Sequence, residues 1–273
     1  MGEIPRLSPS IADKVLQAPI LGWSAHRLLG NHREKKKESQ VEWQLWHAAL
    51  LEGGAGIEVL DFDAFRSKDA KEARDRALHD GKIPIVRPKW EAMQGGVEAI
   101  KEQLHTHGIN LDGVVEERIE WEQRATSGEA VACSGYIDHR NGMTIDDLKT
   151  GSGFTSKHMA GQLIAKGHSL LQDAAYRSAI SAIHLEDLER VKMRYVFVMT
   201  QEPYVVTPVE MSGEYKEISR IRWQRAIDIW AACLANGTNR KHWPGAVEAG
   251  TIATVHPPGW MMSQEMEEEA LRG

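Results

Sequence analysis

The chain has few cysteines, no long apolar run and no excess of positive charge. Only Cys133 and Cys233 are cysteine among its 273 residues, which excludes a disulfide framework, a CxxC metal site and an iron–sulfur cluster with four cysteine ligands. No run approaches the roughly 18 apolar residues that cross a bilayer. The first residues, 1–6, lack the charged-then-apolar layout of a signal peptide. We therefore expect no membrane association and a cytoplasmic location.

The net charge of −6 counts against a protein that coats DNA with its whole surface, because such binding depends on Lys and Arg neutralising phosphates. The charge does not exclude a nuclease, whose basic residues can be confined to one channel. The run Gly151-Ser-Gly153 lacks the GxxxxGK[ST] pattern, so we expect no nucleotide cofactor. Hydrophobic residues at 42% and charged residues at 26% are ordinary for a globular protein.

The order of predicted elements indicates an α/β or α+β fold. We predict one domain over residues 1–250, with a helical N-terminal part, and an irregular acidic tail over residues 251–273. Asn141-Gly142 predicts a hairpin turn between two of the strands. On the last predicted helix, Ile218, Ile221, Ala226, Ile229 and Leu234 are expected to form the buried side. The predicted helices cover 41–51, 65–79, 90–107, 156–165, 169–184 and 214–235, and the predicted strands cover 57–60, 83–86, 114–121, 130–138, 143–149, 194–200 and 204–209.

The residues that can carry chemistry lie on the predicted hairpin around Asn141-Gly142. Alternation places Asp147 and Lys149 on one face and the Leu148 side chain in the core, while Asp138 on the preceding strand can approach Asp147. Mg²⁺ prefers oxygen ligands, which these carboxylates and the Leu148 carbonyl can supply. Lys149 would position the attacking water or stabilise charge on the phosphate. An exposed hairpin with a simple Asp–Lys pair remains an alternative.

A helix after this hairpin strengthens the hypothesis of a nuclease. Gln172 and Tyr176 lie at i and i+4, on one helix face. Asp-x-Lys on a strand, followed by Gln-x-x-x-Tyr on a helix, resembles the RecB-like branch of the PD-(D/E)xK nucleases. In that family the Gln and Tyr contact DNA phosphate or order the active-site lysine. The resemblance implies a restriction-endonuclease-like core, with a central mixed sheet flanked by helices.

Upstream stretches narrow the resemblance to the phage-type RecE exonuclease domain (exonuclease VIII). The upstream stretches are residues 46–52, 65–75 and 81–86. Two downstream stretches, residues 195–204 and 243–245, resemble the same family. The resemblance implies that His47 is a metal ligand, although Trp43 stands where the family usually has a small residue. It assigns a catalytic role to Glu116. The neighbouring Glu117 is the alternative, and only one of them can serve because their side chains point to opposite faces of the strand. His139 is expected to turn away from the site as an exposed turn residue.

The resemblance also implies a function. It is Mg²⁺-dependent digestion of double-stranded DNA from its ends, 5′→3′, with Mn²⁺ able to substitute. A homo-oligomer, a single-strand annealing partner and a role in recombination in a bacterium or phage-infected host are implied as well. Lys35, Lys36 and Lys37 are either a DNA backbone contact or a solvated loop. A structure-specific endonuclease, a catalytically inactive DNA-binding module and a metal-dependent hydrolase of another substrate remain alternatives.

Overall fold

The computed structural model describes residues 5–24, 38–153 and 156–257, and the single positions 259, 263 and 266, with only the backbone for 38–41. Lys35, Lys36 and Lys37, and most of the acidic tail, lie outside the described residues. The elements in chain order are α1 (Pro9–Gln17), α3 (Glu38–Leu51), β1 (Ile57–Leu60), α4 (Lys68–His79), β2 (Ile83–Val86), α5 (Arg87–Thr106), β3 (Val114–Arg124), β4 (Ala130–Asn141), β5 (Thr144–Gly151), α6 (Lys157–Lys166), α7 (Ser169–His184), β6 (Lys192–Met199), β7 (Val206–Glu210) and α8 (Gly213–Ala235), with 3₁₀ turns at Leu188–Arg190 and Arg240–His242.

Serine side chains fix where several helices begin. Ser8, Ser67, Ser156 and Ser212 each precede a helix, and each hydroxyl accepts a hydrogen bond from a backbone N–H in the first turn. Such caps satisfy N–H groups that have no partner inside the helix. The predicted helices and strands are all present, with bounds that shift by a few residues.

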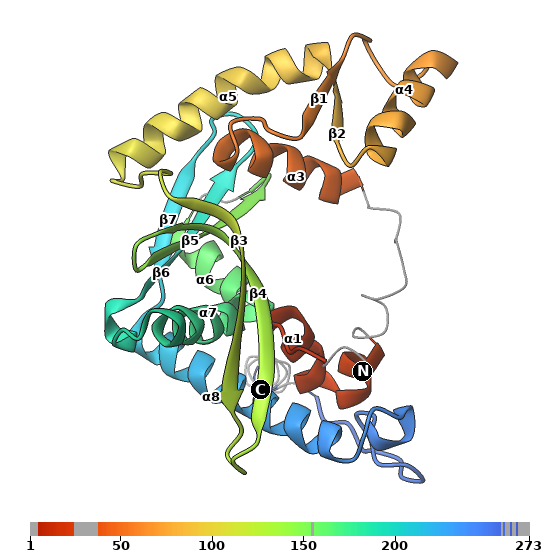
Figure 1. The fold of residues 1–273 in the computed structure, drawn as a ribbon, viewed down its shortest axis with the longest axis vertical. Coiled ribbons are helices and arrows are strands. Elements are labelled where there is room, and N and C mark those ends of the chain that lie inside the picture. Colours follow the sequence, from red (N-terminus) through yellow and green to blue (C-terminus); the bar gives the residue numbers. More distant parts are fainter. Residues whose placement is uncertain are drawn as a thin grey trace.

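The central layer is a mixed five-stranded sheet in the order β3-β4-β5-β6-β7 (Figure 1). β5 and β6 run parallel, and the other neighbours are antiparallel. β1 and β2 form a separate parallel pair, so the described part of β2 is an edge strand, as Pro84 predicts. The turn between β4 and β5 consists of Gly142 and Met143, one residue later than predicted. Gly142 has φ +59° and takes the first turn position, which type II′ hairpins give to glycine.

Helices cover the sheet on both faces, which confirms the predicted mixed α/β architecture. β6 shows this most clearly, because Tyr195 and Phe197 pack with α1, α7 and α8, whereas Val196 and Val198 pack with α3 and α5. A strand buried on both faces has to be apolar at successive positions, as this segment is. In Figure 1, α3 and α5 lie on the upper side, and α1, α7 and α8 lie on the lower side.

The buried face of α8 differs in part from the prediction. Ala226 is buried as predicted, but Ile218 and Ile221 are exposed, and Trp223 and Trp230 point into the core. Ser219 explains the rotation: its hydroxyl donates to the Leu170 carbonyl at 2.5 Å and accepts from the Ala174 N–H at 3.1 Å. The polar residue therefore docks α8 on α7. No helix in the described part of the chain is long and apolar enough to cross a membrane.

Candidate active site

The strands β4 and β5, which carry the predicted catalytic residues Asp138, Asp147 and Lys149, diverge where these residues lie. β4 and β5 pair at Asn141↔Thr144, Arg140↔Ile145 and His139↔Asp146, and the ladder ends there. Beyond it, the Leu148 N–H donates to Asp138 Oδ2 at 2.8 Å. The Asp138 carboxylate thus takes the place of a backbone acceptor. The divergence of the two strands leaves room for side chains from a third element.

That third element is α3, which brings in His47. The side chain is buried, and its Nε2 lies 3.2 Å from the Leu148 carbonyl oxygen. A carbonyl oxygen only accepts, so the proton of a neutral ring sits on Nε2 and a lone pair sits on Nδ1. Nδ1 has no hydrogen-bond partner and lies 3.7 Å from Glu116 Oε1. A divalent cation bound between this buried lone pair and the carboxylate would satisfy both groups.

Glu116 reaches His47 through an unusual backbone conformation. Its φ is +48°, and the β3–β4 ladder pairs Val115↔His139 and Glu117↔Ile137 but omits Glu116 opposite Asp138. A non-glycine residue in the left-handed region costs roughly 1–2 kcal/mol, and such strain clusters at functional sites. Glu117 instead binds Arg140, whose Nε and Nη2 donate at 2.6 and 2.8 Å. Of the two glutamates, Glu116 is therefore the one brought to the site.

His47, Glu116 and Asp138 form a group that can hold a metal ion. One ligand atom from each lies within 4.8 Å of the others. The donor set of one imidazole and two carboxylates suits a divalent cation, and the unpartnered Nδ1 of His47 fits a ligand role. The backbone of Leu148, whose carbonyl is a predicted ligand, contacts two of the three side chains: its N–H donates to Asp138 and its carbonyl oxygen faces His47.

Acidic charge accumulates around this group. Burial, followed by the charge of Asp147, raises the pKa of Asp138 from an ordinary 3.8 to about 7, although Asp138 as a whole residue is only partly buried. Burial and the charge of Glu116 also raise the pKa of Glu52, near the end of α3. Sequence reasoning missed Glu52, five positions after His47. Neighbouring carboxylates repel one another when all are ionised, and a bound cation would offset this repulsion. The raised pKa values therefore favour cation binding at this group.

Asp147 and Lys149 form a second cluster beside the first, ordered by Gln172 of α7. Lys149 Nζ lies 2.5 Å from Asp147 Oδ2. The two groups form an ion pair, but their angles do not meet those of a hydrogen bond. Lys149 also donates to Gln172 Oε1 at 3.1 Å, and Gln172 Nε2 donates to Asp147 Oδ1 at 2.9 Å. Both Asp147 oxygens are thus engaged, and Asp147 is not part of the group around His47. Gln172 orders the lysine, one of the two roles the sequence suggested.

Tyr176 lies one turn after Gln172 and is buried against β4. A Cβ at Gly135 would lie 2.4 Å from Tyr176 Cε1, so this position needs a glycine for the tyrosine to pack. Burial, followed by the charge of Asp147, raises the pKa of the Tyr176 hydroxyl above its ordinary value. The side chains of Gln172 and Tyr176 are both buried. This burial favours a role in ordering the neighbouring residues of the site over direct contact with DNA.

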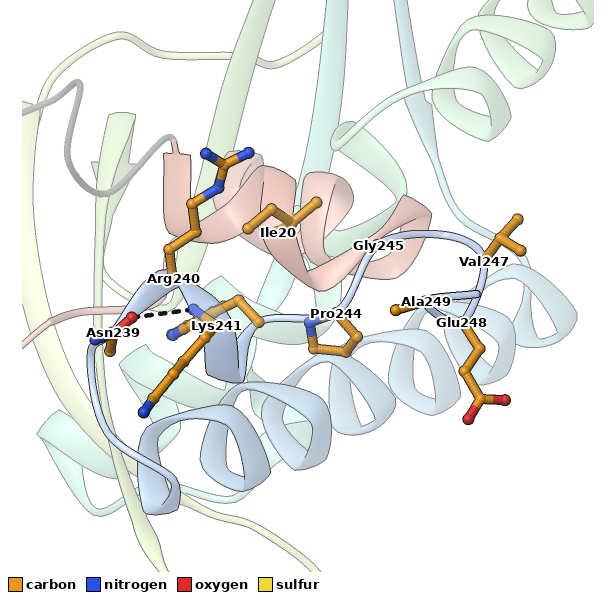
Figure 2. A pocket seen from close by; sticks show the side chains of 10 residues that line it. Ile20, Asn239, Arg240, Lys241, Pro244, Gly245, Val247, Glu248 and Ala249 are labelled. Carbon is orange, nitrogen blue, oxygen red and sulfur yellow. Dashed lines mark hydrogen bonds between the residues drawn. The ribbon is translucent and has the colours of Figure 1, made fainter. Parts of the chain in front are cut away.

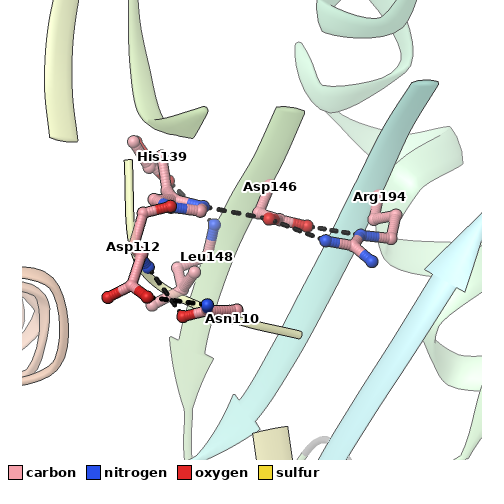
Figure 3. A network of polar contacts seen from close by, with 7 residues as sticks. Asn110, Asp112, His139, Asp146, Leu148 and Arg194 are labelled. Carbon is pink, nitrogen blue, oxygen red and sulfur yellow. Dashed lines mark hydrogen bonds and ion pairs between the residues drawn. The ribbon is translucent and has the colours of Figure 1, made fainter. Parts of the chain in front are cut away.

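His139 is not the exposed turn residue that alternation predicts but is fully buried. Its Nδ1 lies 3.0 Å from Asp146 Oδ2, and its Nε2 lies 3.1 Å from the Asp112 carbonyl oxygen (Figure 3). Arg194 donates to both Asp146 oxygens, at 2.6 and 2.9 Å. Both His139 nitrogens therefore lie within hydrogen-bond distance of an acceptor oxygen. This network holds β4, β5 and β6 together next to Asp138 and Asp147.

Replacing Asp146 with Asn is expected to lower the free energy of unfolding by about 3 kcal/mol, because the partly buried Arg194 loses its counter-charge and the hydrogen-bond network around the buried carboxylate is broken. Burial raises the pKa of Asp146, but hydrogen bonds from His139 and Arg194 outweigh it, and the net pKa is below the ordinary value. The stabilisation is therefore complete above the unfolded pKa of about 3.9 and is lost as the pH falls through the lower folded pKa.

Urea denaturation at pH about 7 and at pH about 2 would measure the loss, with the exposed Asp63→Asn as the matched control. We expect a lower midpoint for Asp146→Asn at neutral pH and a smaller difference at acid pH. An unchanged midpoint at neutral pH would contradict the stabilising role of the network.

A hollow of about 1090 Å³ lies away from these residues, between Ile20 and the segment 239–249 (Figure 2). Figure 2 shows Arg240, Lys241 and Glu248 projecting at different points around it. No group of histidine and carboxylate ligands lines it among the described residues. The candidate catalytic residues lie instead at the junction of α3, β3, β4, β5 and α7.

Comparisons with known proteins give a fold and no family. No protein-family model and no curated protein matches the chain. A solved structure described as "Putative exonuclease" from Eubacterium rectale is similar, with a TM-score of 0.55 and 11% identity over 95% of this chain and 92% of that one. At such low identity the likeness shows a shared nuclease-like α/β fold alone. A second structure, SSO0001, has a TM-score of 0.29 and 14% identity over 68% of this chain and 84% of that one, and carries no argument.

Proposed function

We propose that this chain is a Mg²⁺-dependent exodeoxyribonuclease of the PD-(D/E)xK type that hydrolyses phosphodiester bonds from the ends of double-stranded DNA. One observation carries the proposal. The unpartnered Nδ1 of His47 faces the carboxylates of Glu116 and Asp138, directly beside the Asp147–Lys149–Gln172 cluster. A cation site adjacent to an ordered lysine is the arrangement that hydrolysis of a phosphodiester requires.

The roles of the side chains follow from their contacts. His47, Glu116 and Asp138 would hold a divalent ion, which supplies Lewis-acid stabilisation of the phosphate and lowers the pKa of a water molecule. Lys149 would donate to a non-bridging phosphate oxygen or orient the attacking water. Gln172 keeps the Lys149 ammonium in place through its carbonyl oxygen. Asp147 balances the charge of the Lys149 ammonium at 2.5 Å.

Fold similarity supports the choice of a nuclease over other phosphate-transfer enzymes. The structure from Eubacterium rectale that shares this fold is described as "Putative exonuclease". The RecE-like motifs in this sequence further suggest 5′→3′ resection in recombination, with Mn²⁺ able to replace Mg²⁺. Under the same proposal the active form is a cytoplasmic homo-oligomer that encloses DNA and works with a single-strand annealing protein. Lys35, Lys36 and Lys37 are then candidates for a DNA backbone contact.

The dependence on DNA ends is testable by comparing end-labelled linear duplex with covalently closed circular DNA in Mg²⁺. We expect the purified protein to degrade the linear duplex and leave the circle intact, with no product in EDTA. The labelled end that is released first gives the polarity. Cleavage of the circle would instead support a structure-specific endonuclease. Tight binding without cleavage of either substrate would support a catalytically inactive DNA-binding module.

A further inference from the structure

Two exposed aromatic side chains border the candidate metal group. Trp43 is 40% exposed and Tyr136 is 58% exposed, and no other aromatic side chain in the described part of the chain is among the exposed large hydrophobic residues. The other Phe, Trp and Tyr side chains that the structure describes are buried or partly buried, as in an ordinary core. Trp43 and Tyr136 are the two exceptions, and both lie close in sequence to a member of the same candidate metal group, His47 and Asp138 respectively.

Trp43 is in direct contact with a candidate metal ligand. It lies one turn before His47 on α3, and the two ring centroids are 4.2 Å apart with an interplanar angle of 40°. One face of the indole covers the histidine, and a large part of the side chain remains open to solvent. Trp43 therefore presents an apolar surface at the rim of the metal group.

Tyr136 lies on β4, two residues before Asp138, so alternation directs both side chains to the same face of the strand. Its cross-strand partner on β3 is Arg118, whose side chain is exposed and binds Glu120 at 2.6 Å. Gly135 leaves room for Tyr176 to pack behind the strand at this point. Tyr136 is thus held on a rigid strand with its ring in solvent.

Exposed aromatic rings beside a phosphate-cleaving centre suit one kind of partner. Nucleic-acid bases stack on aromatic side chains irrespective of sequence, and each stacked base contributes about 1–3 kcal/mol. In an intact duplex the faces of the bases are covered by their neighbours. Only bases that are unpaired or unstacked can offer a face to Trp43 or Tyr136.

We propose that Trp43 and Tyr136 are base-stacking contacts that receive unpaired nucleotides next to the phosphate held at the His47–Glu116–Asp138 group. This inference rests on the proposed function and specifies its substrate as a DNA strand that is single or frayed at the site. An enzyme with such contacts acts faster on a duplex with splayed, unpaired terminal nucleotides than on a blunt duplex of the same sequence.

The test uses 2-aminopurine placed among the terminal nucleotides of blunt and splayed duplexes. Binding is measured in Ca²⁺ by the fluorescence change of 2-aminopurine, and cleavage is measured in Mg²⁺. Trp43→Ala and Tyr136→Ala are compared with Trp43→Phe and Tyr136→Phe, which keep a ring. Leu78→Ala is the matched control, because Leu78 is 49% exposed but lies on α4. Thermal melting checks that every variant is folded.

We expect each alanine variant to raise KM for the splayed duplex about tenfold, with a smaller change in kcat, and to lose stacking fluorescence. The phenylalanine variants, which keep a ring, should lose less binding than the alanine variants, and Leu78→Ala should retain wild-type values. Wild-type cleavage with both alanine variants matching Leu78→Ala would overturn this inference alone. Stacking by the wild type without cleavage would overturn the proposed function and leave the inference standing. Neither binding nor cleavage by the wild type would overturn both.

Discussion

Replacing Lys149 with Met is expected to slow cleavage of linear duplex DNA by at least about 100-fold, the scale for losing one preorganised charge-stabilising group. Methionine keeps most of the side-chain length but removes the ammonium that contacts Asp147 at 2.5 Å and Gln172 at 3.1 Å. Asp138→Ala and Asp147→Ala should cause losses of similar size, because in the proposed site all three groups would act on one phosphate. Single-turnover cleavage in Mg²⁺ measures the chemical step without the effect of product release.

Lys71→Met is the matched control for this substitution, since Lys71 is exposed on α4. It should leave the cleavage rate unchanged. If the three site variants all cleaved at nearly the wild-type rate, the residues would not form the active site, and the ion pair would be a structural feature of the hairpin.

Replacing Asp138 with Asn is expected to make the metal-free protein more stable while it abolishes activity. Burial, followed by the charge of Asp147, raises the pKa of Asp138 to about 7, so at higher pH the folded protein contains a buried, repelled carboxylate. Asparagine keeps the acceptor for the Leu148 N–H, which Asp138 binds at 2.8 Å, without the charge. We expect a gain of about 1–3 kcal/mol at pH about 8, or several degrees in Tm.

The direction of the pH dependence follows from the raised pKa. Between the ordinary value of 3.8 and about 7, the folded metal-free protein binds a proton that the unfolded chain has lost, so its stability falls as the pH rises through this window. The difference between variant and wild type should therefore be large at pH about 8 and small at pH about 4. Added Mg²⁺ should raise the Tm of the wild type and leave Asp138→Asn unchanged. A less stable variant at pH about 8 would contradict this account.

The catalytic hairpin could be predicted because it depends on local rules. Alternation along β5 and the i, i+4 spacing of Gln172 and Tyr176 each place two side chains on a common face. In the structure, Lys149, Asp147 and Gln172 bind one another, in agreement with these predicted faces. The helix positions and the β4–β5 hairpin follow from equally local signals, such as serine caps and the turn at Gly142.

Features that depend on distant segments could not be read from the sequence. His139 is buried because Asp112 and Asp146 surround it, and neither contact follows from the alternation of β4. The positive φ of Glu116 interrupts a regular strand pattern. The buried face of α8 depends on Ser219 binding α7, whereas hydrophobicity alone favours Ile218 and Ile221.

The central claim is that a divalent ion at His47, Glu116 and Asp138 is required for this protein to cleave DNA. Its most direct test is the cleavage rate of end-labelled linear duplex as a function of Mg²⁺ concentration, for the wild type and Asp138→Asn in parallel. We expect the wild-type rate to rise from zero in EDTA to a plateau, and the variant to yield no product over the same range. Cleavage by the wild type in EDTA, or equal cleavage by Asp138→Asn, would contradict the claim.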